Sequence, residues 1–166
     1  MAPKADLDLD AYFPYLINRV GAALVTTFGK DPLGRHQLNI AMWRALAALS
    51  RNGGLRLVDL ADVTSIDVST LSRMVTRLIR LGLVLRTRST TSDREVLVSL
   101  MPKGRRLLDR LIPVALQFEA ALTEGIPQAD LAIVNRVLHR MHANMMQAPS
   151  LLPRNGNRGT TRRARK

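Results

Sequence analysis

The chain has 166 residues, of which 46% are hydrophobic, and its formal net charge is +12. This length suits one domain with a substantial core, and the composition argues against a wholly disordered chain. The absence of cysteine excludes disulfides, thiolate zinc sites and thiol redox sensing, while the positive charge points to a polyanionic partner such as nucleic acid.

The N-terminal segment, MAPKADLDLDAYF, lacks the charged and then apolar layout of a signal peptide. No apolar run approaches the length needed to cross a bilayer, so we expect a cytoplasmic protein without a membrane partner. Residues 11–29 then repeat apolar side chains at helical spacing, and Gly29 with the following KDPLG ends this first predicted helix.

Three further helices are predicted over residues 40–52, 57–64 and 68–81. Asn39 is placed to cap the first of them and Asp67 the last, because short polar side chains satisfy the free N–H groups of a helix N-terminus. Glycines follow the first and last of these helices, as expected at helix C-termini.

The helical spacing of apolar side chains is lost over residues 83–100. LVLRTR and EVLVSL are rich in aliphatic and β-branched residues and are joined by the polar STTSD, which predicts an antiparallel hairpin. A helical pattern resumes after Pro102 and is expected to be interrupted at Pro113. Pro127 is well placed at the start of a last helix over residues 130–147.

The final segment, residues 149–166, contains six basic and no acidic side chains and no periodicity, so we expect a disordered tail. It is either a nonspecific DNA-binding arm or a solubilising extension. Residues 1–148 still hold 19 basic and 13 acidic side chains. The part of the chain that is predicted to fold is therefore basic on its own account.

The order of elements predicts the fold class. Three consecutive helices with tight turns, followed by a two-stranded ribbon, describe a winged helix-turn-helix. We therefore expect a mainly α protein with a small β-hairpin wing. The first helix and the last two helices lie outside this unit.

The helix over residues 68–81 divides into two faces when it is placed on a helical wheel at about 100° per residue. One arc is apolar and the other contains only hydroxyls and guanidiniums, without the acidic partners that solvated helices usually carry. An amphipathic core helix with an incidentally basic face is the alternative interpretation.

The polar face suits a DNA major groove, because arginine can bind guanine through two hydrogen bonds and short hydroxyls allow close approach. The predicted DNA contacts of this recognition helix are Ser69, Thr70, Ser72, Arg73, Thr76 and Arg77. The wing, over residues 83–100, adds basic side chains that could reach the minor groove or the backbone, namely Arg86, Arg88 and Arg94.

The sequence from MWRAL to LMPKG resembles the core of the MarR family of transcriptional regulators. The matching segments are LNIAMWRAL at the second helix, STLSRMVTRLIRLGLV at the recognition helix, and VLVSLMPKG at the end of the wing. The likeness covers roughly residues 10–147. One departure is that the family wing usually has Asp two residues before its Arg, where this chain has Ser92; Asp93 either positions Arg94 or is merely solvated.

The resemblance implies a homodimer on double-stranded DNA with a pseudo-palindromic operator, and a winged helix-turn-helix with flanking dimerisation helices. The implied organisation is an N-terminal dimerisation helix and linker, a DNA-binding lobe, C-terminal dimerisation helices and a basic tail, over residues 1–36, 37–101, 102–148 and 149–166. We expect a repressor that is released by a small ligand.

Members of this family often bind small aromatic or phenolic acids between the dimer helices and the DNA-binding lobe. By that resemblance, an aromatic wall with an arginine for a carboxylate is formed by Tyr12, Tyr15, Arg19, His36, Met42 and Trp43. Plain packing or solvation is the alternative for each of these residues.

Other functions have weaker support in the sequence. His139 and His142 lie on one side of the last helix, but two imidazoles without a nearby carboxylate or thiolate are too few ligands for a typical metal site. Neither a metal nor another cofactor is therefore expected. No catalytic motif is present, and an enzyme is not expected.

The alternative function is a basic RNA- or ribosome-associated winged-helix protein, against which the 4% aromatic content argues. A winged helix that binds proteins would need an exposed apolar patch where this chain has arginines.

Overall fold

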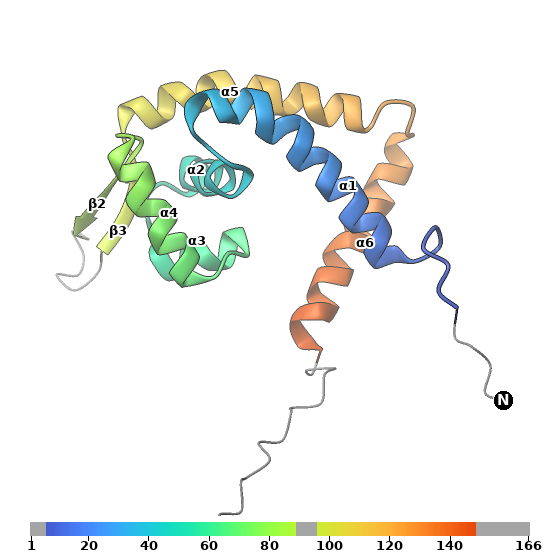
Figure 1. Ribbon diagram of the computed structural model, residues 1–166. Coiled ribbons are helices and arrows are strands. Elements are labelled where there is room, and N and C mark those ends of the chain that lie inside the picture. The colour runs from blue at the N-terminus through green and yellow to red at the C-terminus, as the bar shows by residue number, and fades with distance from the viewer. Residues whose placement is uncertain (1–5, 89–95, 149–166) are drawn as a thin grey trace, which may run out of the picture. The chain divides into compact units, whose positions relative to one another are not determined.

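The computed structural model describes residues 6–88 and 96–148. The chain forms two compact units, one ending at Leu122 and the other beginning at Thr123. The first unit contains all the strands in these ranges (Figure 1). Its elements are α1 (Phe13–Phe28), η1 (Gly29–Leu33), η2 (Gly34–His36), α2 (Ile40–Asn52), β1 (Leu55–Arg56), α3 (Leu57–Thr64), α4 (Val68–Arg80), β2 (Val84–Arg88), β3 (Val96–Leu100) and α5 (Pro102–Leu122).

The predicted fold class is confirmed: α2, α3 and α4 are followed by an antiparallel β2–β3 ribbon, in which Val84 pairs with Leu100 and Arg88 with Val96. The sheet has a third strand that the sequence did not predict. The two residues of β1 pair with β3 on the side opposite β2, giving the order β1-β3-β2. This strand anchors the turn between α2 and α3 to the wing.

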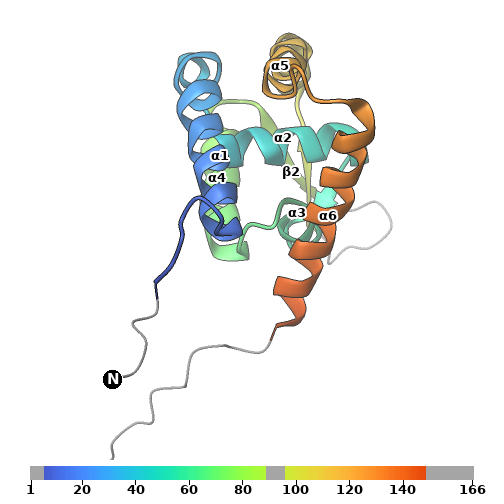
Figure 2. The same ribbon diagram turned by 90° about the vertical axis from the view of Figure 1, so that its right-hand side faces the viewer.

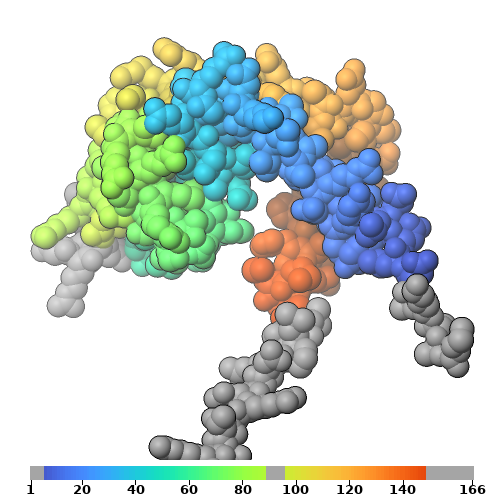
Figure 3. All heavy atoms as spheres, in the orientation of Figure 1, coloured from blue at the N-terminus to red at the C-terminus, as the bar shows by residue number. Residues whose placement is uncertain are grey.

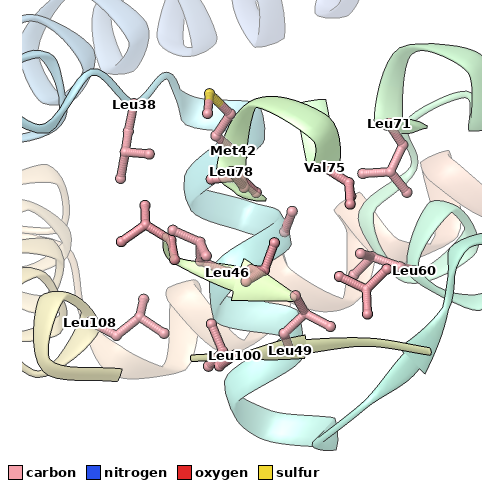
Figure 4. Packing of buried hydrophobic residues seen from close by; sticks show 14 of the residues in the cluster. Leu38, Met42, Leu46, Leu49, Leu60, Leu71, Val75, Leu78, Leu100 and Leu108 are labelled. Carbon is pink, nitrogen blue, oxygen red and sulfur yellow. The ribbon is translucent and has the colours of Figure 1, made fainter. Parts of the chain in front are cut away.

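The core of the first unit collects side chains from α2, α3, α4, the strands and α5. Figure 4 shows that Leu71, Val75 and Leu78 of α4 point into the same interior as Leu46 of α2 and Leu60 of α3. Each of these five side chains is almost completely buried. Because these apolar side chains pack together, α4 is held with its other face outward.

The predicted interruption at Pro113 is wrong, because α5 continues through this residue. Proline removes one backbone hydrogen bond and crowds the preceding turn. Core packing on both sides offsets this cost: Leu108 and Leu111 are buried before the proline, and Phe118 packs against the same core after it. Likewise α1 ends at Phe28, close to the predicted end, but the chain stays in short helical turns through His36.

The second unit contains α6 (Gln128–Gln147), one continuous helix with Pro127 at its N-cap (Figure 2). None of its residues is buried, and Ile133, Val134 and Val137 are exposed. An amphipathic helix with a bare apolar face has room for a partner on that face. The predicted tail over residues 149–166 lies outside the described residues. In the described part of the chain, no helix is long and apolar enough to cross a membrane.

Candidate nucleic-acid interface and ligand pocket

The N-terminus of α4 is capped as the sequence predicted. The Asp67 carboxylate accepts hydrogen bonds from the Thr70 backbone N–H, at 2.8 Å, and from the Ser69 hydroxyl, at 2.7 Å. Hydrogen bonds from Thr70 and Ser69 hold the pKa of Asp67 well below its ordinary value. The cap therefore remains a carboxylate at neutral pH, where it fixes the first turn of the helix.

Helix α4 lies on the surface of the first unit (Figure 3), and the residues of its polar face are exposed or half-buried. Ser69, Arg73 and Thr76 are exposed, whereas Thr70 and Ser72 are half-buried. The Thr76 hydroxyl donates to the Ser72 carbonyl within the helix. Among the described residues, the Arg73 side chain has no hydrogen-bonding or ion-pair partner, so its guanidinium is available to an external acceptor.

The C-terminus of α4 is tied to its surroundings by two basic side chains. Arg77 donates from Nη2 to the backbone carbonyl of Gln37, at 3.1 Å, and Lys103 donates from Nζ to the carbonyl of Leu81, at 2.8 Å. Gly82 has φ +70°, and Leu83 N–H returns to the Leu78 carbonyl. This left-handed glycine and its return bond end the helix sharply. Arg77 thus has a structural contact besides the predicted contact with DNA.

The first turn of α5 lies directly against the chain that leaves α4. Gly104 is buried, and a Cβ atom at this position would overlap the carbonyl oxygen of Leu83. Only glycine allows such a close approach of one backbone to another. The recognition helix is therefore joined to α5 through backbone contact as well as through side chains.

Two of the three predicted wing contacts lie in the described part of the chain. Arg86 and Arg88 belong to β2 and are exposed. They lie two residues apart on one strand, so they extend from the same face of the ribbon. Arg94 and its neighbours Ser92 and Asp93 lie outside the described residues.

A pocket of about 470 Å³ lies between α1, α2 and α5. Three aromatic rings meet beside it: Phe28 contacts Trp43 and Phe118 edge to face, with ring centroids 5.7 and 5.1 Å apart. Its charged lining residues are Arg44 and Glu119, and most of the remaining lining is aliphatic. An apolar cavity with few polar groups is the usual form of a small-molecule site.

The residues that resemblance assigned to a ligand site are dispersed. Trp43 lines the aromatic pocket, whereas Met42, only 1% exposed, faces the core. Tyr12, Tyr15 and Arg19 lie exposed on α1 or just before it and do not line the aromatic pocket. His36 lines a different pocket, beside the start of α5. Their role in ligand binding stays a prediction.

Sequence reasoning missed Arg44, which follows Trp43 and is the arginine that lines the aromatic pocket. Its position beside the single tryptophan was the available signal, but the pocket also needs Phe28 and Phe118, which are distant in sequence. On α6, His139 and His142 line a shallow pocket with Asn135 and Leu138. Within the described ranges, no third metal-ligating side chain joins the two histidines.

Comparison with known proteins agrees with this geometry. The MarR family model matches residues 38–96, which run from just before α2 to the first residue of β3. A MarR-family transcriptional regulator from Silicibacter pomeroyi is 32% identical, with a TM-score of 0.73, and the alignment covers 85% of this chain and 97% of that protein. BpsR from Bordetella bronchiseptica, whose DNA binding is regulated by 6-hydroxynicotinic acid, is 26% identical, with a TM-score of 0.74 over 83% of this chain and 98% of BpsR.

The HTH-type transcriptional regulator FarR from Neisseria gonorrhoeae is 32% identical over 89 residues, which are 54% of this chain. The matched region spans 60% of the length of that relative. The fold is that of a winged-helix protein. The chain belongs to the MarR family of transcriptional regulators, as the resemblance predicted.

Proposed function

We propose that the protein is a dimeric, sequence-specific DNA-binding regulator that represses transcription until a small ligand releases it. The observation that carries this proposal is the face of α4, where Arg73 is exposed near the Ser69 hydroxyl and has no hydrogen-bond or ion-pair partner among the described residues. Such a face can enter a major groove with its N-terminal half directed at base edges. Arg86 and Arg88 of the wing supply further positive charge for the backbone or the minor groove.

Dimer formation has support in the apolar residues that the fold leaves bare. Phe13 of α1, Leu116 of α5 and Val134 of α6 are 63%, 59% and 49% exposed. Each lies on a helix that is not part of the winged helix-turn-helix, and exposed apolar surfaces of this kind mark interaction sites. A two-fold dimer would place two recognition helices on half-sites about one helical turn of DNA apart, roughly 34 to 36 Å.

Selection from random duplexes tests this proposal. We expect the full chain to recover an inverted repeat whose half-sites are separated by about one helical turn. The selection should be repeated with a structured RNA as competitor, since RNA association is the alternative function. Recovery of no motif, with binding that vanishes uniformly as salt rises, would contradict sequence-specific recognition. Better competition by RNA than by duplex DNA would favour the alternative.

The aromatic pocket is the proposed site of the releasing ligand. Phe28, Trp43 and Phe118 form an apolar, aromatic wall, and Arg44 offers a guanidinium to a carboxylate. An aromatic acid matches this combination if its carboxylate lies at Arg44 and away from Glu119, the other charged lining residue, and the DNA binding of BpsR is regulated by such an acid, 6-hydroxynicotinic acid. A ligand held between α1, α2 and α5 would favour one arrangement of these helices and shift the population of DNA-binding dimers.

Trp43, the single tryptophan of the chain, is an intrinsic reporter of this pocket. We expect an aromatic carboxylate from a screen that includes 6-hydroxynicotinic acid to change its fluorescence saturably and to release bound operator. Arg44→Gln should weaken that binding about tenfold, because it removes a charge-assisted hydrogen bond.

Arg19→Gln is the matched variant, because Arg19 does not line the aromatic pocket. It should leave affinity nearly unchanged if Arg44 holds the carboxylate. A loss in Arg19→Gln alone would assign the carboxylate to the residue that the family resemblance indicated. Operator release without any fluorescence response would place the ligand elsewhere.

A further inference from the structure

A second pocket, of about 310 Å³, lies where η2, the chain after α4 and the start of α5 meet. It is separate from the aromatic pocket, with which it shares no lining residue. No acidic side chain lines it, and its other lining residues are Gln37 and three leucines. Its ionisable lining residues are Arg35, His36, Lys103, Arg106 and Arg110.

Two of these cations are already engaged by the protein. Arg35 pairs with Asp31 through two hydrogen bonds, at 2.7 and 2.9 Å, and Lys103 donates to the Leu81 carbonyl. Arg106 and Arg110 are exposed, and neither side chain has a partner among the residues that the structure describes. The pocket therefore presents two uncompensated guanidiniums.

The start of α5 carries an excess of positive charge that is unfavourable for the helix by itself, because Asp109 is the one acidic side chain among Lys103, Arg105, Arg106 and Arg110. Its first turn contains no acid, although positive charge near a helix N-terminus opposes the helix dipole. Arg106 and Arg110 are four residues apart, so their like charges lie one turn from each other on the same side. A bound anion would relieve both sources of repulsion.

We propose that this pocket binds a small ligand with two or more negative charges, such as a phosphorylated or dicarboxylate metabolite. Guanidinium groups match the oxyanions of phosphate and carboxylate through paired hydrogen bonds. The volume is at the small end of the range for ligand pockets, which suits a compact anion. Leu81 lies 14 residues after the Asp67 cap, about 20 Å along the helix direction, so the pocket is far from the base-reading end of α4.

The site is linked to the recognition helix through residues that line it. Gln37 accepts the hydrogen bond from Arg77 of α4, and Lys103 holds the carbonyl that follows the helix. An anion in this pocket competes with the Leu81 carbonyl for the Lys103 ammonium group. The same anion lies beside Gln37, whose backbone carbonyl accepts the hydrogen bond from Arg77. The ligand therefore changes operator affinity, a consequence that rests on the proposed function. Anion binding itself does not.

The experiment titrates the full chain, without DNA, with inorganic pyrophosphate or citrate at constant ionic strength. Calorimetry measures affinity, and amide NMR shifts locate the site. The pocket variant is Arg106→Gln with Arg110→Gln. The control is Arg105→Gln with Arg136→Gln, which loses the same charge at exposed positions outside the pocket. Thermal melting checks that each variant folds.

We expect saturable binding, shifts over residues 35–37, 81–83 and 103–110, and an affinity at least about tenfold weaker in the pocket variant than in the control. Equal losses in both variants would overturn the proposal, because they indicate bulk electrostatics. So would the absence of saturable binding, or shifts elsewhere in the wild-type chain. If the pocket variant loses operator binding while the wild type ignores both anions, the arginines serve duplex phosphates and the proposal fails.

Discussion

Arg73→Ala should weaken operator binding by about 1 to 3 kcal/mol and relax the preference for one base position in each half-site. This expectation follows from the position of Arg73 on the exposed face of α4, in its N-terminal half, without a hydrogen-bond or ion-pair partner among the described residues. The substitution should leave the free energy of unfolding nearly unchanged, because alanine is a better helix former and no hydrogen bond or ion pair is lost. Binding to the selected operator and to single-base variants measures both effects.

The control for this substitution is Arg105→Ala, which removes the same charge from an exposed position on α5. It should not change base preference. If Arg73→Ala weakens binding equally on all sequences and reduces the salt dependence by about one counterion, the side chain contacts a phosphate and not a base. Full affinity in Arg73→Ala would remove this residue from the interface.

Leu78→Ala should lower the free energy of unfolding by about 2 to 5 kcal/mol, the usual range for emptying a fully buried leucine site. Leu78 is completely buried and belongs to the core cluster that also contains Met42 and Leu46. Since these contacts set the orientation of α4, operator binding should weaken as well. Urea denaturation at a fixed protein concentration measures the loss, because a dimer couples stability to concentration.

Ile79→Ala is the matched control for Leu78→Ala. It removes a side chain of similar size from the next position, which is 37% exposed. Its cost should be closer to 1 kcal/mol, because less apolar area is withdrawn from water. Equal losses for the two substitutions would mean that α4 is not packed in solution as described. A changed urea slope would instead indicate an altered unfolded or native state.

The central helices could be predicted closely because their ends carry local chemical signals. Asn39 and Asp67 accept the capping hydrogen bonds expected of them, and Gly82 has the left-handed conformation expected after α4. The strand β1 could not be predicted in the same way. A strand of two residues is too short to show a periodic pattern, and β1 pairs with a partner strand more than 40 residues away in the sequence.

The candidate sites divide along the same line. The two faces of α4 follow from helical spacing alone, so the exposed residues of its polar face could be named in advance. The second contact of Arg77, with the Gln37 carbonyl, joins residues 40 positions apart and has no local signal. The aromatic pocket likewise brings together α1, α2 and α5, which sequence spacing cannot align.

The close approach of Gly104 to the Leu83 carbonyl brings the backbone of α5 directly against the chain that leaves α4, with no side chain between them at this point. Packed backbones of this kind transmit displacement instead of absorbing it. The first turn of α5 and the recognition helix α4 are therefore expected to move together as one rigid body. In the proposed two-fold dimer, a small tilt of α5 would therefore change the distance between the two recognition helices that contact the DNA.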